Sequence, residues 1–421
     1  MTWPNVKIGE LCLPTKQRDP RNEVNGSFRY IDISSIDREN KEIGETITIF
    51  GPDAPSRARK EVYAGDVLIS TVRPNLNTIA IVPSFLHEQI ASTGFTVLRA
   101  DRKLLNEKFL FFWTQTATFI NYLISQMKGA HYPAVSDKII KESHLPLPAL
   151  SEQRCIVEIL YQADTLRKKR VEADNVAEKI LPVLFHKMFG DPIQLMNSKS
   201  AIEIKNLPID LKNGFACGDK DVSGGIPHLR MNNIDDLGLL NLDLVRRVPL
   251  EMDRQQYRLE ERDVLFMSTN SEDKVGKSCV FYRPYESSFL FSNHILRLRS
   301  LDTDRMPPEY LSCFLHLLWQ KGFFPSIAKR WVNQSTVTRN ALENIRLYLP
   351  NENEQKKFSN TYLTVMKQRG ERVKSKERID ILFDSIMHRA FSGDLTAKWR
   401  EAHMKELLQE MQEQAKELKI K

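Results

Sequence analysis

The stretch LPLPALSEQR at residues 145–154 decides how the chain is organised, because it returns in altered form as LYLPNENEQK at residues 347–356. Five positions keep their residue type at an offset of 202: Leu145, Leu147, Pro148, Glu152 and Gln153. A residue before proline favours an extended backbone, and Ser151 in the first copy, or Asn351 or Asn353 in the second, can begin a helix. Each copy therefore predicts a junction between an extended segment and a helix.

The repeat continues on both sides of this junction. Without a gap, AVSDKIIKESHLPLPALSEQR aligns with TVTRNALENIRLYLPNENEQK. Further along, the matched pairs are Arg167 and Arg369, Arg170 and Arg372, Val171 and Val373, His186 and His388, and Phe189 and Phe391. One register kept over more than 50 residues indicates an internal duplication.

The segments upstream of each junction repeat more faintly and favour β structure. GDVLISTVRPN (65–75) resembles RDVLFMSTNSE (262–272), and STGFTVLRA (92–100) resembles SNHILRLRS (292–300). In the first half, FRYIDISSI, ETITIF, DVLIST, TIAIVP and FTVLRA alternate or are rich in β-branched residues, which is typical of strands. The spacing in FLFFWTQTATFINYLISQM predicts a helix packed on that sheet. Each half is expected to hold a β-rich module of about 150 residues and a helical segment of about 40.

The two helical segments carry heptad seams. The seam of the first copy is predicted at Ile156, Ile159, Ala163, Leu166, Arg170, Ala173, Ala177, Ile180 and Leu184; that of the second at Phe358, Thr361, Val365, Gln368, Arg372, Ser375, Ile379, Leu382 and Ile386. A helix of this size is about 58 Å long, well beyond a small domain, so antiparallel pairing of the two copies buries both seams economically. The alternative is that each helix packs on its own module. Pro182 predicts a kink or a break in the first helix.

Length and composition bound the class of protein. A chain of 421 residues predicts two or three domains. The longest apolar run, around Phe109 to Trp113, is far shorter than the roughly 20 residues of a membrane helix, and the first residues do not resemble a secretory signal, which favours a cytoplasmic protein. The five scattered cysteines favour neither a metal site nor a disulfide framework. Lys plus Arg number 61 against 54 for Asp plus Glu, a balance that suits either a polyanion binder or an ordinary basic protein.

Signatures of catalysis are missing from the sequence. It contains no GxxxxGK[ST], no GxGxxG after a strand, no HExxH, no GxSxG and no paired CxxC. Acidic residues near lysines could be assembled into a nuclease-like pattern, but a chain that is 27% charged supplies such combinations freely. The sequence therefore predicts no catalytic residue and no metal site.

Polar loops rich in Arg, Asn and Lys are prominent instead, and these residue types contact base edges and phosphates. The same residues are also common in turns and on surfaces, so each alone is a weak signal. The candidate DNA contacts in the first half are Arg57, Arg59, Arg73, Asn75, Asn77, Lys128, His131 and Tyr132. Those in the second half are Arg230, Asn232, Asn233, Asn270, Lys274, Lys277, Arg330, Asn333 and Gln334.

These features resemble the DNA-specificity (S) subunits of Type I restriction-modification systems over almost the whole chain. The most specific marks are the two junctions, each followed by a long helix that ends in LFHKMFGDP or IMHRAFSGDL. PSRAR, GDVLISTVRPNLN, ASTGF and YPAVSD look like one type of target-recognition domain, and RMNNI, DVLFMSTNS, VGK and QSTVT look like another.

The resemblance implies an α+β fold with five parts: target-recognition domain 1 (1–148), spacer helix 1 (149–192), target-recognition domain 2 (193–350), spacer helix 2 (351–395) and a helical tail (396–421). It implies that each domain reads one half of a split, asymmetric site in double-stranded DNA. The paired helices are expected to set the spacing and to dock two methyltransferase subunits, with restriction or translocase subunits in the full complex.

The same resemblance implies a non-catalytic chain that binds no cofactor, with S-adenosylmethionine, ATP and Mg²⁺ used by the partner subunits. Two alternatives stay open from the sequence. One is the specificity portion of an enzyme with its own nuclease or methyltransferase activity, and the other is a stand-alone DNA-binding regulator.

Overall fold

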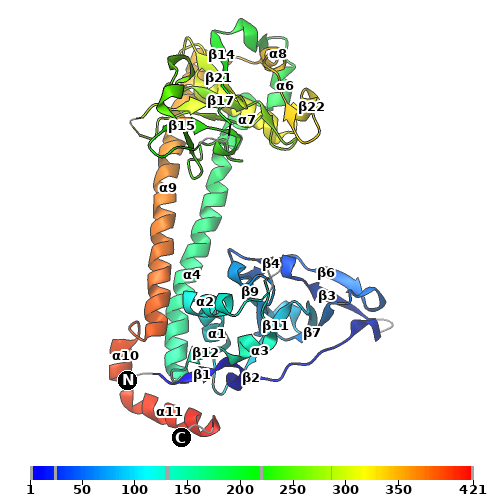
Figure 1. The fold of residues 1–421 in the computed structure, drawn as a ribbon, viewed down its shortest axis with the longest axis vertical. Coiled ribbons are helices and arrows are strands. Elements are labelled where there is room, and N and C mark those ends of the chain that lie inside the picture. Colours follow the sequence, from blue (N-terminus) through cyan, green and yellow to red (C-terminus); the bar gives the residue numbers. More distant parts are fainter. Residues whose placement is uncertain (1–2, 23–25, 129–132, 219–220, 286, 419–421) are drawn as a thin grey trace. The chain divides into compact units, whose positions relative to one another are not determined.

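The protein forms two compact units in a computed structural model that describes residues 3–22, 26–128, 133–218, 221–285 and 287–418. Unit 1 comprises Met1–Val171 with Ser375–Lys421, and unit 2 comprises Glu172–Lys374. Each unit holds one β-rich module and part of each of two long helices, α4 (Leu150–Glu178) and α9 (Glu352–Ser392) (Figure 1). The expected α+β fold, with two β-rich domains and long helices, is confirmed.

Module 1 is built on two four-stranded sheets, with strand orders β6-β3-β10-β7 and β2-β11-β8-β9. The first four are β3 (Ser27–Ile31), β6 (Ile47–Phe50), β7 (Ala58–Val62) and β10 (Gln89–Ser92); the second four are β2 (Cys12–Leu13), β8 (Val67–Ser70), β9 (Ile79–Ile81) and β11 (Phe95–Ala100). Two short ladders, β1 (Asn5–Lys7) with β12 (His144–Pro146) and β4 (Ile36–Asp37) with β5 (Glu42–Ile43), complete it. The predicted strand segments are all represented.

Helices cover one sheet of module 1 and differ from the prediction at one point. The segment predicted as one helix forms two, α1 (Glu107–Trp113) and α2 (Ala117–Ser125), because Thr116 caps the second by accepting a hydrogen bond from Phe119 N at 3.3 Å. Phe109 and Leu110 of α1 are fully buried in one core with Ile156 of α4. A third helix, α3 (Asp137–Glu142), precedes β12.

Module 2 repeats this plan. Its main sheet has the order β14-β21-β17-β19, beside two three-stranded sheets, β16-β15-β20 and β18-β23-β22, and the ladder β13-β24. The strands are β13 (Ile202–Glu203), β14 (Ile209–Asn213), β15 (Ile226–Leu229), β16 (Arg246–Val248), β17 (Val264–Met267), β18 (Thr269–Asn270), β19 (Ser278–Val280), β20 (Leu290–Phe291), β21 (Ile295–Ser300), β22 (Lys329–Arg330), β23 (Ser335–Thr336) and β24 (Arg346–Leu347). Helix α7 (Pro308–Gln320) packs on β17 and β19, and α8 (Arg339–Glu343) precedes β24.

The repeated junction closes each module with a short antiparallel ladder. Leu145 in β12 pairs with Val6, and Leu347 in β24 pairs with Ile202; both leucines are fully buried. Helix α4 begins at Leu150 and α9 at Glu352, where Asn351 caps the helix by accepting from Glu354 N at 3.0 Å. The predicted change from extended chain to helix is therefore present in both copies.

The first long helix breaks near the proline, as predicted. Helix α4 ends at Glu178, and α5 (Ile180–Phe189) starts two residues later. Pro182 is the third residue of α5, where a backbone N–H would have no partner within the helix, so proline is tolerated. The short α6 (Pro192–Met196) follows, whereas α9 runs unbroken to Ser392.

Within each unit the two long helices pair in antiparallel fashion. In unit 1 the start of α4 packs near the end of α9, with the Arg167 guanidinium 4.5 Å from the centre of the Phe383 ring. In unit 2 the end of α4 meets the first half of α9, where Arg372 lies 3.7 Å from Asp174 and Arg369 lies 3.9 Å from Glu178. The predicted pairing is confirmed in direction.

The predicted seam is buried at some positions and exposed at others: Ile156 and Phe358 are fully buried, as predicted. Leu166 and Leu382, which were expected in the seam, are 66% and 59% exposed, whereas Leu160 and Phe383 are buried. The start of α4 packs against α1 as well as against α9, which buries Leu160 outside the predicted two-helix seam. Beyond α9, helices α10 (Ala397–Ala402) and α11 (Met404–Glu417) belong to unit 1. Among the described residues, no helix combines the length and apolar character needed to cross a membrane.

Candidate nucleic-acid interface

The two modules share one backbone framework, which fixes which residues are equivalent. Strands β3 and β10 run parallel with Tyr30 opposite Ile90, and β15 and β20 run parallel with His228 opposite Leu290. In both modules a single turn of 3-10 helix follows, at Ile33–Ser35 and at Met231–Asn233. Asp32 of module 1 therefore occupies the position of Arg230 in module 2.

The hydrogen bonds around this position repeat as well. The backbone N–H of Asp32 donates to Ser35 Oγ at 3.3 Å, and that of Arg230 donates to Asn233 Oδ1 at 2.8 Å. After the neighbouring strand, Ser92 Oγ accepts from Gly94 N and Ser292 Oγ accepts from His294 N, each at 3.3 Å. Gly94 and His294 are thus also equivalent.

The predicted polar loops meet beside these turns in each module. Thr71 N donates to Gly94 O at 2.8 Å, and Ser268 N donates to His294 O at 2.9 Å. Residues 71–77 then bridge to 133–135 through the Val72–Ala134 pair, and residues 268–270 bridge to 335–337 through Thr269–Thr336. Loops that lie about 60 residues apart in sequence therefore form one continuous edge in each module.

In module 1 the candidate residues spread along this edge. Arg57 is exposed, and its carbonyl accepts from Thr93 N at 2.8 Å, beside the Asp32 turn. Arg59 is half-buried and donates to Ala58 O at 2.6 Å. Lys128 is exposed and pairs with Ala134. His131 and Tyr132 lie outside the described residues.

The turn at residues 73–77 presents its candidates by an unusual backbone. Arg73 and Asn77 both have left-handed conformations, with φ of 49° and 47°, and they flank the 3-10 turn Pro74–Leu76. This geometry leaves Arg73 and Asn75 exposed. Asn77 is half-buried, and its carbonyl accepts from Lys41 Nζ at 2.6 Å.

In module 2 the candidates divide between surface and structural positions. Arg230 is half-buried, Asn232 is exposed, and both line one cavity. Asn233 is buried and its amide serves the fold, because Nδ2 donates to Asn241 O at 2.8 Å while Oδ1 caps Arg230 N. Asn270 is half-buried and its Oδ1 accepts from Ser271 N at 2.7 Å, whereas Lys274 is exposed.

The remaining candidates of module 2 show the same division. Lys277 is buried, with its Nζ paired to Asp236 and 5.1 Å from the centre of the Trp319 ring, so its charge is used inside the module. Arg330 is exposed and forms a 2.6 Å ion pair with Glu272. Asn333 and Gln334 are exposed at the tip between β22 and β23.

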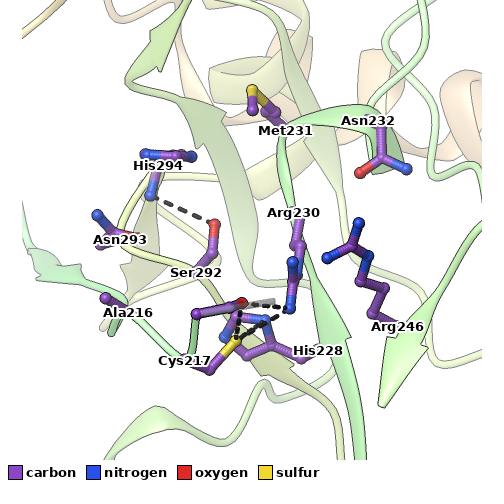
Figure 2. A pocket seen from close by; sticks show the side chains of 11 residues that line it. Ala216, Cys217, His228, Arg230, Met231, Asn232, Arg246, Ser292, Asn293 and His294 are labelled. Atoms are coloured by element: carbon purple, nitrogen blue, oxygen red, sulfur yellow. Dashed lines mark hydrogen bonds between the residues drawn. The ribbon is translucent and has the colours of Figure 1, made fainter. Parts of the chain in front are cut away.

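A cavity of about 540 Å³ lies at the edge of module 2 beside Arg230. Figure 2 shows Arg230, which directly follows β15, and Arg246, in the neighbouring β16, extending toward the same space, with Asn232, Asn293 and His294 around it. Arg230 Nη2 is held by Cys217 Sγ and by Gly218 O, each at 3.1 Å. No residue known to line this cavity within the described chain is acidic.

The charge in this cavity comes from its arginines. Burial and the nearby Arg230 guanidinium lower the pKa of His228 to about 4, and the same two causes lower the pKa of His294. Both imidazoles are therefore neutral at neutral pH. The arrangement offers a donor-rich, cationic recess to electron-rich groups.

Sequence reasoning missed four residues of this edge: Asp32, Arg246, Asn293 and His294. The alignment of STGFTVLRA with SNHILRLRS places Gly94 opposite His294, so it could have pointed to Asn293 and His294 as candidates. Arg246 could not be found in this way, because its place opposite His228 depends on the pairing of β15 with β16. Within the described residues, no group of three or more His, Cys, Asp or Glu side chains is placed to hold a metal ion.

Two related modules that present different side chains on one framework define a two-part recognition protein. The family model for the Type I restriction modification DNA specificity domain matches residues 1–173 and 201–368, so the chain belongs to this family. The protein is a specificity subunit of Type I restriction-modification systems, and its role is the recognition of DNA sequence.

Relatives support this assignment at different extents. The Type I restriction enzyme StySPI specificity subunit of Salmonella potsdam is 21% identical over 385 residues, which cover 86% of this chain and 81% of that protein. The type I restriction enzyme MjaX specificity subunit of Methanocaldococcus jannaschii is 31% identical over 175 residues, 39% of this chain and 40% of that protein. A solved chain, from work on complex assembly and conformational transition of the type I R-M system, has a TM-score of 0.61 and 26% identity, covering 94% of this chain and 98% of that one.

Proposed function

We propose that the two modules read the two halves of a split, asymmetric DNA site, one half each. The observation that carries this proposal is the shared backbone edge with unlike side chains, because Asp32 stands in module 1 where Arg230 stands in module 2. Because the two modules share one backbone framework, we expect them to dock on their duplex segments in the same way. Because their side chains differ, we expect them to recognise different base sequences. Module boundaries at residues 1–148 and 193–350 are part of the proposal.

The long helices are proposed to set the separation of the half-sites and to dock two methyltransferase subunits. Their outer faces support docking, because several large apolar side chains on α4, α5 and α9 are exposed. These are Leu166, Val176, Val183, Val373, Ile381 and Leu382, exposed by 52% to 69%. Large apolar side chains exposed along the helices are available for contact with a partner protein.

Catalysis is assigned to the partners under this proposal. The chain itself binds no cofactor, while S-adenosylmethionine, ATP and Mg²⁺ act in methyltransferase and restriction or translocase subunits. The candidate contacts on the described edge are Arg57, Arg59, Arg73, Asn75, Asn77, Lys128, Arg230, Asn232, Asn270, Lys274, Arg330, Asn333 and Gln334. Asn233 and Lys277 are better explained as structural residues, since both are buried with partners.

A module exchange tests the proposal. Residues 1–145 are replaced by those of a relative, the chain is expressed with its methyltransferase subunits, and methylated adenines are mapped in the host genome. We expect one half of the methylated sequence to change and the other half to stay. A change in both halves, or in neither, would contradict the modular reading.

Co-purification checks the assembly and separates the alternatives. Two methyltransferase subunits for each chain are expected. A chain that purifies alone or as a self-dimer supports a stand-alone regulator. Turnover by the purified chain with S-adenosylmethionine, Mg²⁺, ATP and DNA supports an enzyme with its own active site.

A further inference from the structure

The position shared by Asp32 and Arg230 differs in charge between the modules while its surroundings agree. In each module this residue precedes a 3-10 turn, its N–H is capped by the side chain three residues on, and it lies beside the turn at Gly94 or His294. Only the side chain changes, from a carboxylate to a guanidinium. The two modules therefore carry opposite charges at one equivalent position of their shared framework.

This reversal distinguishes base recognition from phosphate binding. A phosphate oxygen is always an anionic acceptor, so a site for it would not accommodate a carboxylate in one module and a guanidinium in the other. Base edges in the major groove, in contrast, present either acceptors or donors according to the base. A position that alternates between acceptor and donor fits a base edge.

We propose that Asp32 and Arg230 are equivalent base-reading residues, with Arg230 directed at a guanine and Asp32 at the amino group of a cytosine or an adenine. The proposal rests on the function proposed above and names the chemistry that each module reads. Arg230 would donate to guanine O6 and N7, which are both acceptors. Asp32 would accept from cytosine N4 or adenine N6.

The cavity of module 2 is suited to this role. The contacts of Arg230 with Cys217 Sγ and Gly218 O, each 3.1 Å long, hold its guanidinium in place before DNA arrives. Preorganisation of this kind lowers the entropy lost on binding. Arg246, the partner of His228 across β15 and β16, adds a second donor group from the other wall.

Module 1 surrounds Asp32 with hydroxyl groups instead. Tyr30 Oη lies 3.4 Å from Asp32 Oδ1, and Ser34 Oγ lies 3.3 Å from Oδ2. These contacts orient the carboxylate while it stays half-exposed. The neighbouring turn is kept small, because a Cβ at Gly94 would approach Ile33 Cδ1 to 2.7 Å.

Binding selection from a randomised duplex library, using the full chain in complex with its methyltransferase subunits, tests the two residues. For Arg230→Gln we expect the preference for guanine at one position of one half-site to fall about tenfold, with the other half unchanged. For Asp32→Asn we expect relaxed preference at one position of the other half, since an amide both donates and accepts. Arg283→Gln and Asp53→Asn, at exposed positions outside the two turns, are the charge-matched controls.

Substitution of 7-deazaguanine for the selected guanine provides a second measurement. The analogue pairs normally but lacks the N7 acceptor, so wild-type binding should weaken severalfold while binding of Arg230→Gln should not change further. If Arg230→Gln lowers affinity for all sequences equally, more than Arg283→Gln does, the site binds phosphate and the inference is wrong. If the wild-type complex selects no split sequence, the proposed function itself fails, which is a different result.

Discussion

At the scale of the residue, two buried histidines make the stability of unit 2 depend on pH. Burial is the main cause that lowers the pKa of His316 and of His228 to about 4, from an ordinary value of 6.5. His316 faces Asp236, whose carbonyl oxygen lies 3.2 Å from Nε2, and the nearby Lys277 ammonium disfavours a second positive charge. Both imidazoles are therefore neutral in the folded protein.

The sign of the effect follows from proton binding. Between pH 6.5 and about 4 the unfolded chain binds protons that the folded chain does not, so stability falls as the pH falls through this window. We expect each histidine to contribute a loss of about 2 kcal/mol between about pH 7 and about pH 5. Urea unfolding followed by tryptophan fluorescence measures it, since Trp319 lies against His316. His316→Gln should flatten the pH dependence and the exposed His186→Gln should not; equal slopes would contradict the assignment.

At the scale of the element, the Glu-Gln pair of each junction ties the start of a long helix to its module. Gln153 is buried: Nε2 donates to Pro148 O at 2.9 Å and to Leu104 O at 3.0 Å, and Oε1 accepts from Asn106 N at 2.8 Å. Gln355 repeats the first of these bonds, from Nε2 to Pro350 O at 2.8 Å. The glutamine thus folds back on the proline in both copies.

Replacing each glutamine by methionine, which has nearly the same volume, separates two contributions: the bond to proline that both copies share, and the extra bonds of Gln153 to residues 104 and 106. Gln153→Met removes three hydrogen bonds to backbone groups and should cost about 3 kcal/mol, whereas Gln355→Met removes one such bond and should cost about 1 kcal/mol. Chemical unfolding of the full chain measures the difference between the two variants. Equal losses would mean that the shared bond to proline, and not the contacts with residues 104–106, holds the helix start.

The elements show what could and could not be predicted from the sequence. The repeat predicted both helix starts, the break near Pro182 and the direction of pairing, because these depend on local signals and on one offset. The seam was predicted correctly at Ile156 and Phe358, which are buried, but not at Leu166 and Leu382, which are exposed. Two partners of Gln153, Leu104 O and Asn106 N, lie almost 50 residues upstream, and no local pattern shows them.

The polar edge of each module, where the candidate contacts lie, was also predicted only in part. The sequence predicted polar loops as candidate contacts without placing them relative to one another, and the structure pairs residues 72 with 134 and 269 with 336 within their modules. Asn and Lys are residue types that often contact DNA, but the side chains of Asn233 and Lys277 bond within the module. Asn233 donates to Asn241 O, and Lys277 pairs with Asp236. Asp32 was missed because a single acid after a strand carries no signal until the parallel pairing of β3 and β10 is known.

At the scale of the whole molecule, each helix end completes a module. In unit 2, Phe189 at the end of α5 lies 5.1 Å from the ring of Tyr310 in α7. In unit 1 its repeat partner Phe391, at the end of α9, lies 5.1 Å from Phe109 and 5.2 Å from Trp113. In both copies of the repeat, the last aromatic residue of the helical segment therefore packs against a helix of a module.

In unit 1 a helical tail, α10 and α11, follows the end of α9. Arg400 Nε and Thr396 Oγ1 each donate to the buried Glu152 carboxylate at 2.7 Å, and Glu410 accepts from Ser151 N at 3.0 Å. The counterpart of Glu152 in the second copy, Glu354, is exposed. The tail therefore buries Glu152 in an ion pair with Arg400, whereas the equivalent Glu354 stays exposed.

This packing predicts that the tail stabilises the first module. Leu407 of α11 is 1% exposed, whereas its neighbour Leu408 is 42% exposed. Leu407→Ala should destabilise unit 1 by about 2 to 4 kcal/mol, and Leu408→Ala should change it by less than about 0.5 kcal/mol. Hydrogen exchange resolved along the chain separates the units: protection should fall in residues 95–113 and 150–160 and stay unchanged in residues 264–318. Residues 402–418 pack within unit 1 through both polar and apolar groups. An equal loss of protection in both units would therefore show that Leu407 supports the chain as a whole and not module 1 in particular.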